Sequence, residues 1–355
     1  MLDEKEYLQA FEEYKKTANV LLEGFYDLKN EIKKNKKKVD LTRQFSIINL
    51  PSKGLHYSGK NKSLLIRYLT AVEEHILCDS FLMESGRGIE LILSDLIIDD
   101  INVRDLLLSD LQAILIFLRS TAYGDTVELD ISCPHCGKES EQIIRLSELD
   151  FKKPKIEPNE NGKYVIFLPE IEMEFAICPL TFSKELEKHE NETEQDFFVY
   201  KTEDGEEIKV KKEKSLSLVY NIDSINGITD KEKIKTIIRK LPKKYVDVVT
   251  NFISENEVGI DENMNLKCSF CGEEFSQKVL VGYSFLSLPS SYKENIYEEM
   301  FLITYYGKGI TRADAMSMPV VERKWHIRRI KEEVDKQNEA EKAAMRKAKS
   351  SKGKF

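Results

Sequence analysis

Apolar residues recur at intervals of three and four along most of the chain, which is the spacing of one helix face. This pattern predicts helices within residues 3–34, 71–84, 89–123, 181–192, 215–257, 291–306 and 319–348, with a short one beginning at Thr311. The first and last of these helices are highly charged away from their apolar stripes. We expect them to project into water or to lie on a partner.

Alternating and β-prone residues predict strands between the helices. A strand beginning at Phe45 is broken by Pro51 and closed by a turn at Gly54, and residues 164–169 and 171–177 predict a hairpin whose second strand alternates like a half-buried edge. Residues 197–201 and 207–210 predict an exposed, charged hairpin with Asp204-Gly205 at its turn. The chain is therefore predicted to be an α+β protein.

Composition bounds the class of protein. The chain has 355 residues and 41% hydrophobic content, which is enough for a real core and suggests two or three domains. No apolar run approaches the roughly 20 residues that a membrane span needs, and the N-terminus lacks the pattern of a signal peptide, so we expect a cytoplasmic site of synthesis. The net charge is −8, but residues 322–355 carry +6, so the positive charge is gathered at the C-terminal end.

Two short segments carry the clearest chemical information: Cys133-Pro134-His135-Cys136-Gly137 and Cys268-Ser269-Phe270-Cys271-Gly272. In each knuckle, two intervening residues let both thiolates face one ion, and the glycine allows the backbone turn. β-prone residues flank both knuckles, so we expect each to lie at the tip of a hairpin. The pattern predicts a tetrahedral, structural zinc site with the ligands Cys133, Cys136, Cys268 and Cys271.

The two knuckles are 131 residues apart along the chain, compared with roughly 12 to 20 residues in compact zinc ribbons. The longer loop costs about 2 kcal/mol of extra closure entropy, which is small beside the roughly 10 to 16 kcal/mol of binding free energy at a structural zinc site. A disulfide pair is the alternative, but it fits poorly with a chain that lacks a secretion signal. We therefore expect a split zinc ribbon that joins distant segments.

The other cysteines and the histidines suggest no catalytic site. Cys78 and Cys178 have no partner at metal spacing, so packing roles are expected, and His135 is expected to be a turn residue rather than a substitute ligand. The chain contains no nucleophile elbow, phosphate-binding loop or dinucleotide fingerprint. Four thiolates also leave a zinc ion no open coordination position. These observations predict a protein that is not an enzyme.

Several further segments are distinctive in combination: Leu50–Tyr57 (LPSKGLHY), Thr70–Leu77 (TAVEEHIL), Leu118-Arg119 with Tyr123-Gly124, the first knuckle, Leu168-Pro169, Ile222–Gly227 (IDSING), and the second knuckle with Phe285. Together they resemble the baseplate hub proteins and hub assembly factors of T-even-type contractile phage tails, over roughly residues 45–290. The resemblance implies a non-enzymatic virion tail or tail-assembly protein that works through contacts with other baseplate subunits. The long N-terminal helix, the charged hairpin and the basic C-terminal helix do not match the pattern.

We therefore predict a multi-lobed α+β protein in which the split zinc ribbon joins two lobes. Its predicted parts are an N-terminal helical arm (1–40), an N-terminal α+β lobe (41–124), the two ribbon halves (125–150 and 262–288), an inserted α+β lobe (151–261) and a C-terminal helical region with a basic tail (289–355).

The predicted function is that of a structural or assembly component of the baseplate hub region, with one structural Zn²⁺ per chain. The expected partners are other baseplate or tail subunits, and further copies of this chain; the expected location is the host cytoplasm during assembly and the virion tail afterwards, if the protein is retained. The alternative is a zinc-ribbon nucleic-acid-binding protein, suggested by the basic tail. Acidic residues beside the knuckles argue against that alternative: Glu139, Glu141, Glu273 and Glu274.

Overall fold

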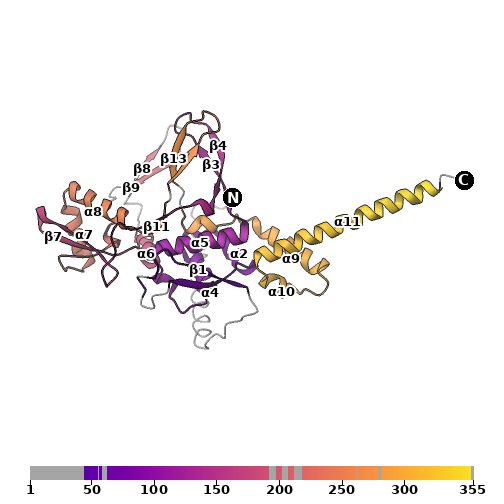
Figure 1. Cartoon of the computed structure of the whole chain (residues 1–355), viewed down its shortest axis with the longest axis horizontal. Helices are drawn as coiled ribbons and strands as arrows, with labels where there is room; N and C mark the ends of the chain where they lie inside the picture. The colour runs from indigo at the N-terminus through magenta and orange to yellow at the C-terminus, as the bar shows by residue number, and fades with distance from the viewer. Residues whose placement is uncertain are drawn as a thin grey trace, which may run out of the picture. The chain divides into compact units, whose positions relative to one another are not determined.

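The structure is a computed structural model that describes residues 44–54, 56–57, 62–191, 197–201, 207–211, 218–261, 263–278 and 281–352. The predicted helix over 3–34 lies outside these residues. The chain from Phe45 onward groups into one unit, and Figure 1 colours its elements by position in the sequence.

The first part of this unit is a two-stranded antiparallel sheet followed by four helices. The strands are β1 (Phe45–Asn49) and β2 (Ser63–Arg67), and the helices are α2 (Ala71–Leu77), α3 (Ser80–Glu84), α4 (Arg87–Leu96) and α5 (Leu108–Tyr123). The single helix predicted over 71–84 is therefore wrong. The chain breaks there because the Asp79 side chain accepts a hydrogen bond from the Leu82 backbone N–H at 3.1 Å and so caps a new helix.

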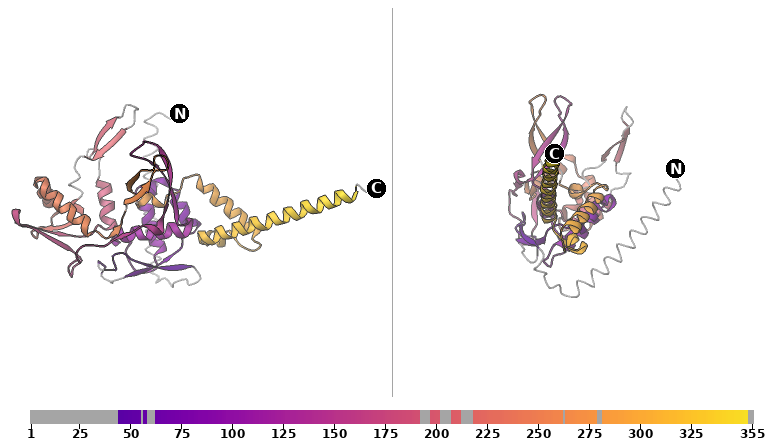
Figure 2. Two further views of the ribbon diagram at one scale, coloured as in Figure 1. Left: turned by 45° about the horizontal axis from the view of Figure 1, so that its top comes forward. Right: turned by 90° about the vertical axis from the view of Figure 1, so that its right-hand side faces the viewer.

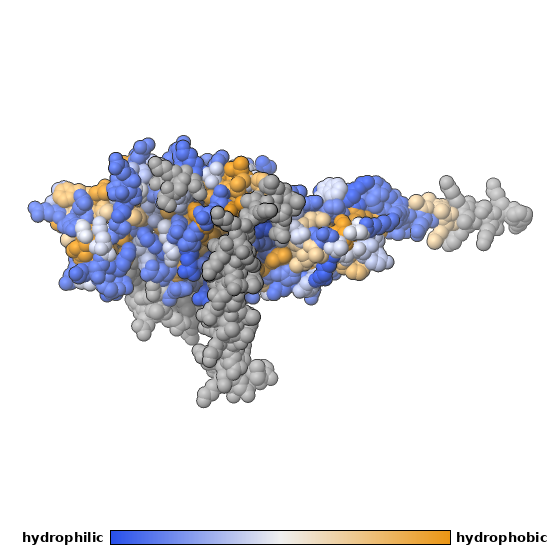
Figure 3. Space-filling model, turned by 90° about the horizontal axis from the view of Figure 1, so that it is seen from below, coloured by the Kyte–Doolittle hydropathy of each residue, from blue (hydrophilic) through white to orange (hydrophobic). Residues whose placement is uncertain are grey.

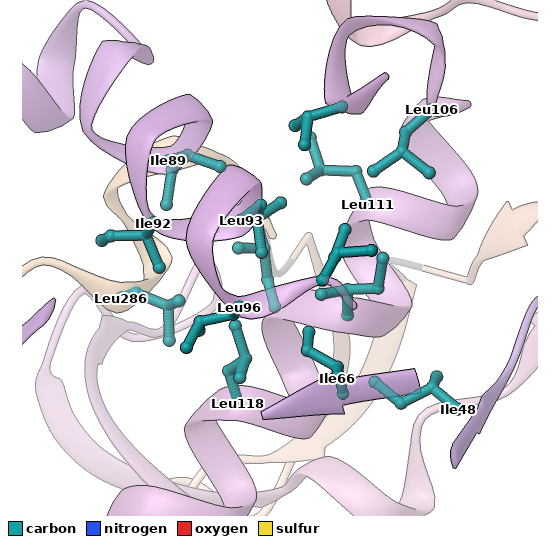
Figure 4. Close-up of a cluster of buried hydrophobic side chains, with 14 of the residues drawn as sticks. Ile48, Ile66, Ile89, Ile92, Leu93, Leu96, Leu106, Leu111, Leu118 and Leu286 are labelled. Atoms are coloured by element: carbon teal, nitrogen blue, oxygen red, sulfur yellow. The ribbon is translucent and has the colours of Figure 1, made fainter. Parts of the chain in front are cut away.

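The main hydrophobic core lies between α4, α5 and the first sheet. Figure 4 shows side chains of this cluster, which come from β1, β2, α4, α5, the later turn η6 (Tyr283–Leu286) and Leu106, just before α5. The α4 members recur at intervals of three and four and are almost fully buried: Ile89, Ile92, Leu93 and Leu96. Each such side chain contributes roughly 1.5 to 3 kcal/mol on burial. Because Leu286 belongs to this cluster, the chain returns to its N-terminal core after the second knuckle.

The turn after β1 closes around a buried carboxylate. Asp110, in the first turn of α5, is 0% exposed and accepts hydrogen bonds from the Ser52 backbone N–H (2.9 Å), the Ser52 hydroxyl (2.6 Å) and the Tyr57 hydroxyl (2.5 Å). The Tyr57 hydroxyl in turn accepts a hydrogen bond from the Leu107 backbone N–H at 3.0 Å. Burial raises the pKa of Tyr57, so its hydroxyl stays protonated and donates to Asp110. Ser52 and Tyr57 of the LPSKGLHY segment thus connect the turn to α5.

A second hydrophobic cluster forms between the two knuckles. Its sheet has the order β10-β7-β6 and comprises β6 (Tyr164–Leu168), β7 (Met173–Ile177) and β10 (Ile222–Ile225), and its helices are α7 (Lys231–Lys240) and α8 (Lys243–Asn256). The predicted hairpin is confirmed, but the prediction that its second strand is an edge is wrong, because β10 pairs with the free side of β7. Residues 222–225 were predicted to lie in a helical region, whereas they form the strand β10. An apolar run this short does not distinguish a helix from a strand.

Shorter elements link this cluster to the main core. β5 (Phe151–Lys152) pairs with β11 (Gly259–Ile260), and α6 (Phe182–Asn191), which confirms the helix predicted over 181–192, packs on the main core through Phe182 and Leu186. The predicted charged hairpin is present as β8 (Phe197–Lys201) and β9 (Glu207–Lys211). Further 3-10 turns in the described part of the chain include η1 (Val103–Asp105), η2 (Leu146–Glu148) and η3 (Pro169–Ile171).

The C-terminal part consists of α9 (Tyr292–Tyr306), α10 (Arg312–Ser317) and α11 (Val320–Lys352). These helices share a third cluster with α2, whose fully or nearly buried members are Ala71, Cys78, Ile296, Met300, Ile303, Ala315 and Ile327. The expected packing role of Cys78 is therefore confirmed. Figures 1 and 2 show that the second half of α11 continues beyond α9 and α10.

A buried ion network fastens α11 to this cluster. The Arg323 side chain is 0% exposed, and its guanidinium pairs with Glu74 of α2, also 0% exposed, and with Glu299 of α9 at 2.6 Å. The Tyr123 hydroxyl donates to Glu74 at 3.0 Å, and Lys324 donates to the Ala122 carbonyl at 3.2 Å. The network joins the helices α2, α5, α9 and α11.

A membrane span is not found among the helices that the structure describes, since none combines the necessary length with an apolar sequence.

Candidate metal centre

Two antiparallel hairpins carry the cysteine knuckles, as the sequence predicts. The first pairs β3 (Thr126–Ser132) with β4 (Glu139–Arg145), and the second pairs β12 (Asn263–Lys267) with β13 (Glu274–Lys278). Each hairpin ends in a six-residue connection that begins with the first cysteine of its knuckle. Figures 1 and 2 show the two hairpins side by side.

Alternation along the strands gives each hairpin an apolar inner face. In β3 the exposed Glu128 and Asp130 alternate with Leu129 and the buried Ile131. Leu129 and Ile131 cluster with apolar and thiol side chains of both hairpins: Cys133, Leu266, Cys268 and Phe275. The two inner faces therefore pack on each other, and the knuckles lie at the end of this apolar layer.

The backbone follows the same course in both knuckles. The Cys133 N–H donates to the Lys138 carbonyl at 3.0 Å and the Gly137 N–H to the Cys133 carbonyl at 2.8 Å; in the second knuckle the corresponding bonds measure 2.9 and 3.0 Å. Gly137 and Gly272 have φ angles of +67° and +77°, and open space surrounds the position of a Cβ at each. These glycines are required by the left-handed backbone conformation rather than by lack of room.

The four cysteine sulfurs converge across the two hairpins. The Sγ atoms of Cys133 and Cys271 are 3.8 Å apart, those of Cys136 and Cys268 are 3.7 Å apart, and all four lie within 4.8 Å of one another. A tetrahedral zinc ion with Zn–S bonds of about 2.3 Å separates its sulfurs by roughly 3.8 Å. The cysteines are not bonded to each other. The four residues therefore lie close enough to bind one metal ion, and the sulfur spacing is compatible with zinc.

The knuckle backbone favours the thiolate form of Cys268. The backbone N–H groups of Cys271 and Phe270 interact with this sulfur, the latter at 3.4 Å, and lower the pKa of Cys268 to about 6. The thiolate is the form that binds metals. Cys133 and Cys268 are buried, whereas Cys136 and Cys271 are exposed at the end of the hairpins. Half of the sulfur cluster is thus covered by protein and half is reachable from solvent.

One contact between the knuckles has no signal in the sequence. Lys138, which directly follows the first knuckle, places its ammonium group 5.0 Å from the centroid of the Phe270 ring, and Phe270 is 58% exposed. This cation–π contact adds to the apolar layer in holding the two knuckles together. Lys138 and Phe270 become neighbours only because the two hairpins pack face to face.

The other candidate residues of the sequence lie apart from the sulfur cluster. Within the described ranges, the metal-binding group around the knuckles consists of the four cysteines, and His135 is an exposed residue of the first turn. Cys178 is half-buried and lines a small pocket with Tyr164 and Phe252 in the second hydrophobic cluster. Burial raises the pKa of Cys178, as expected for a thiol that packs rather than reacts.

The structure also contains buried polar residues that the sequence patterns did not reveal. The sequence gives only a weak indication that Asp110 has a structural role, namely that it is an acidic residue in the first turn of a helix. It gives none for Glu74 and Arg323, because 33% of the residues are charged and a buried charge looks like any other in the sequence. Their partners are far away along the chain, and only folding brings them together.

In a comparison with known protein families, residues 43–285 match a family model described as T4 bacteriophage base plate protein. The match covers more than half of the chain and includes both hairpins, and it ends just before α9. No curated protein and no solved structure gives a significant match. The family supports a structural component of a phage baseplate, located in the virion tail and in contact with other baseplate components. The chain belongs to the T4 bacteriophage base plate protein family.

Proposed function

We propose that this chain is a non-enzymatic structural or assembly component of the hub region of a contractile tail baseplate, and that a zinc ion bound by Cys133, Cys136, Cys268 and Cys271 stabilises it. The observation that carries the zinc proposal is the convergence of four sulfurs from hairpins that are 131 residues apart in sequence.

Zinc fits the donor set better than the other common metals. Four thiolates are soft ligands that select zinc or an iron–sulfur cluster, and a single tetrahedral ion matches the 3.7 and 3.8 Å separations of the sulfurs. Four protein ligands also fill the coordination sphere, so the ion would have no position for a substrate. Its role would be structural.

The proposed ion would act as a clasp between two parts of the chain. It would join the ribbon halves 125–150 and 262–288 and thereby fix both ends of the inserted segment 151–261. The apolar layer between the hairpins is small, with Ile131 and Phe275 as its buried hydrocarbon side chains. Metal binding would supply the larger share of the free energy that holds the hairpins together.

The hub assignment rests on the resemblance of the sequence to hub proteins and hub assembly factors. A protein of this kind works through its contacts with neighbouring subunits, in the host cytoplasm during assembly and in the tail if it is retained. Mass spectrometry of purified tails tests retention, and co-purification with separately expressed hub subunits tests the contacts. Binding to subunits of the outer baseplate alone would contradict the hub role.

The zinc proposal is tested by elemental mass spectrometry of the purified full-length protein. We expect one zinc ion per chain, and none in the Cys268→Ser/Cys271→Ser variant. Cys178→Ser is the matched control, because it removes a thiol that lies outside the cluster and should keep the ion. Limited proteolysis provides the second measurement: the metal-free variant should be cut within residues 137–267 faster than the parent protein. Equal metal content in the parent and the double variant would refute the assignment of the ligands.

A nucleic-acid-binding role has less support. The exposed Phe270 and Lys138 resemble a stacking site, but exposed carboxylates surround the two hairpins: Glu128, Asp130, Glu139, Glu141, Glu273 and Glu274. They would repel phosphates. Tight, salt-sensitive binding to single-stranded DNA, lost on Phe270→Ala substitution, would favour this alternative.

A further inference from the structure

The outer face of α9 carries an exposed row of aromatic side chains. Tyr297, Phe301 and Tyr305 follow each other at intervals of four and are 49%, 60% and 67% exposed. The Phe301 and Tyr305 rings stack with their centroids 5.4 Å apart. The opposite face of α9 is buried in the third hydrophobic cluster. Since aromatic side chains are enriched at protein interfaces, such a row indicates a binding surface.

Two acidic residues extend this row toward the start of α9. Glu294 and Glu298 are exposed and share a helix face with Phe301 and Tyr305. We call these four residues and Tyr297 the α9 ridge. It is about 17 Å long, at 1.5 Å of rise per residue, and it is acidic at one end and aromatic at the other. A suitable partner would offer positive charge and small or flexible apolar groups.

The end of α11 has this complementary chemistry. From Lys342 to Lys352, which we call the α11 tip, the sequence contains five basic residues, no acidic residue, three alanines and Met345. The helix register places Lys342, Met345 and Arg346 on one face, and all three are exposed. Figure 3 shows that most of the extended part of α11 is hydrophilic, with a light orange band before its grey end.

The α11 tip cannot reach the α9 ridge of its own chain. α11 is one continuous helix whose first half is fixed by the buried residues Arg323 and Ile327. Arg346 lies 19 residues after Ile327, and the rise of a helix places it about 29 Å further along the axis. Figures 1 and 2 show this part of α11 pointing away from α9. The complementary surface that the tip can reach belongs to another molecule.

We propose that the α11 tip binds the α9 ridge of a second copy of this chain. Lys342 and Arg346 face Glu294 and Glu298 of the other copy, and Met345 packs on its aromatic rings. In a dimer with a two-fold axis, the tip of each copy binds the ridge of the other. No ridge or tip is then left to bind a third copy, so the assembly closes at a dimer. Each contact is small, and the second forms at high effective concentration once the first is made.

This interaction does not depend on the metal centre. The ridge and the tip both lie after residue 285, outside the part of the chain that matches the family. The charge distribution favours it, because residues 1–321 carry −14 against +6 for residues 322–355. Such an imbalance speeds the approach of a basic helix to a second copy and makes the contact sensitive to salt.

Light scattering on the full-length protein measures the proposed dimer directly. At low ionic strength, about 0.05 M, we expect the mass of two chains, and at about 1 M, where charges are screened beyond roughly 3 Å, the mass of one. The variants Lys342→Glu/Arg346→Glu and Glu294→Lys/Glu298→Lys should each be monomers at low salt. An equimolar mixture of these two variants should regain the two-chain mass, because the acidic tip of the first variant then meets the basic ridge of the second, and the basic tip of the second meets the acidic ridge of the first.

A matched control separates the ridge from general charge effects. Glu157→Lys/Glu160→Lys changes the net charge by the same amount at two exposed residues far from α9 in sequence and should remain a dimer. Phe301→Ser/Tyr305→Ser should be monomeric and folded, since both side chains are exposed. A parent protein that is monomeric at low salt, a charge-reversed variant that remains a dimer, or a mixture that stays monomeric would each overturn the proposal. A dimer lost in the Cys268→Ser/Cys271→Ser variant would place the interface at the metal centre and overturn it as well.

Discussion

The substitution Arg323→Met tests how strongly the C-terminal helices are bound to the part of the chain that matches the family. Arg323 is 0% exposed, and its guanidinium pairs with Glu74, which is equally buried, and with Glu299. Methionine fills much of the same space with apolar atoms. The substitution therefore removes the positive charge and leaves the Glu74 carboxylate buried with the Tyr123 hydroxyl as its remaining side-chain partner among the contacts described.

The expected loss of stability is large because the buried Glu74 carboxylate stays negatively charged but loses the positive charge of Arg323 beside it. Removing one partner of a buried ion pair typically costs about 3 to 5 kcal/mol, which at roughly 2 °C per kcal/mol lowers the melting temperature by about 6 to 10 °C in a chain of this size. Arg329→Met is the matched control. Arg329 lies on the same helix, is 50% exposed and pairs with Glu332 and Glu333, so its loss should cost less than about 1 kcal/mol.

The loss should also depend on pH in a defined direction. Burial already raises the pKa of Glu74, and Arg323 opposes this shift. Without Arg323 the folded-state pKa rises further above the value of about 4.3 in the unfolded chain. A raised folded pKa contributes stability below the unfolded pKa, and this contribution disappears as the pH rises through the folded pKa. The difference between Arg323→Met and the parent protein should therefore be larger at pH 8 than at pH 5.

Calorimetry at both pH values measures these effects, together with the double variant Glu74→Gln/Arg323→Met. Removing both charges should cost less than Arg323→Met alone, since the fully buried carboxylate of Glu74 is then gone and the one that loses its partner, Glu299, is 19% exposed. A melting temperature for Arg323→Met within about 2 °C of the control, or a deficit that shrinks as the pH rises, would show that the network is not buried and charged as described.

Three further changes test other parts of the structure. Tyr57→Phe removes the hydroxyl that bridges Asp110 and the Leu107 N–H, so we expect a loss of about 1 to 3 kcal/mol in urea denaturation; an unchanged midpoint would contradict the bridge. Gly272→Ala places a side chain at φ +77° in open space, so it should cost about 1 kcal/mol of backbone strain and weaken metal retention against a chelator without abolishing it. Excess chelator should remove the metal from the parent protein and expose residues 137–267 to protease, and added zinc should reverse both changes. If the metal-free protein remained resistant to protease, the metal would not be what fixes the two ends of the inserted segment.

The sequence determined the features that depend on neighbouring residues. Helical spacing gave α9 and α11, alternation gave the hairpin of β6 and β7, and the Cys-x-x-Cys-Gly repeats placed two knuckles at hairpin tips. The sequence also indicated the baseplate family, because several segments that are distinctive only as a set occur together in it. Where the local signal was short, as in residues 222–225, or interrupted by a side-chain cap, as at Asp79, the prediction failed.

The tertiary structure decided what depends on contacts between distant residues. It brought the four sulfurs to within 4.8 Å of one another, made β7 a central strand, and buried Asp110, Glu74 and Arg323. It also left the aromatic row Tyr297, Phe301 and Tyr305 of α9 exposed, although helical spacing alone does not distinguish these side chains from the buried ones of the same helix. The physical reason is the same in each case. Spacing along a chain fixes which side chains share a face, but only packing decides what covers that face, and the free energy of a charge or a thiol depends on the groups that packing places around it.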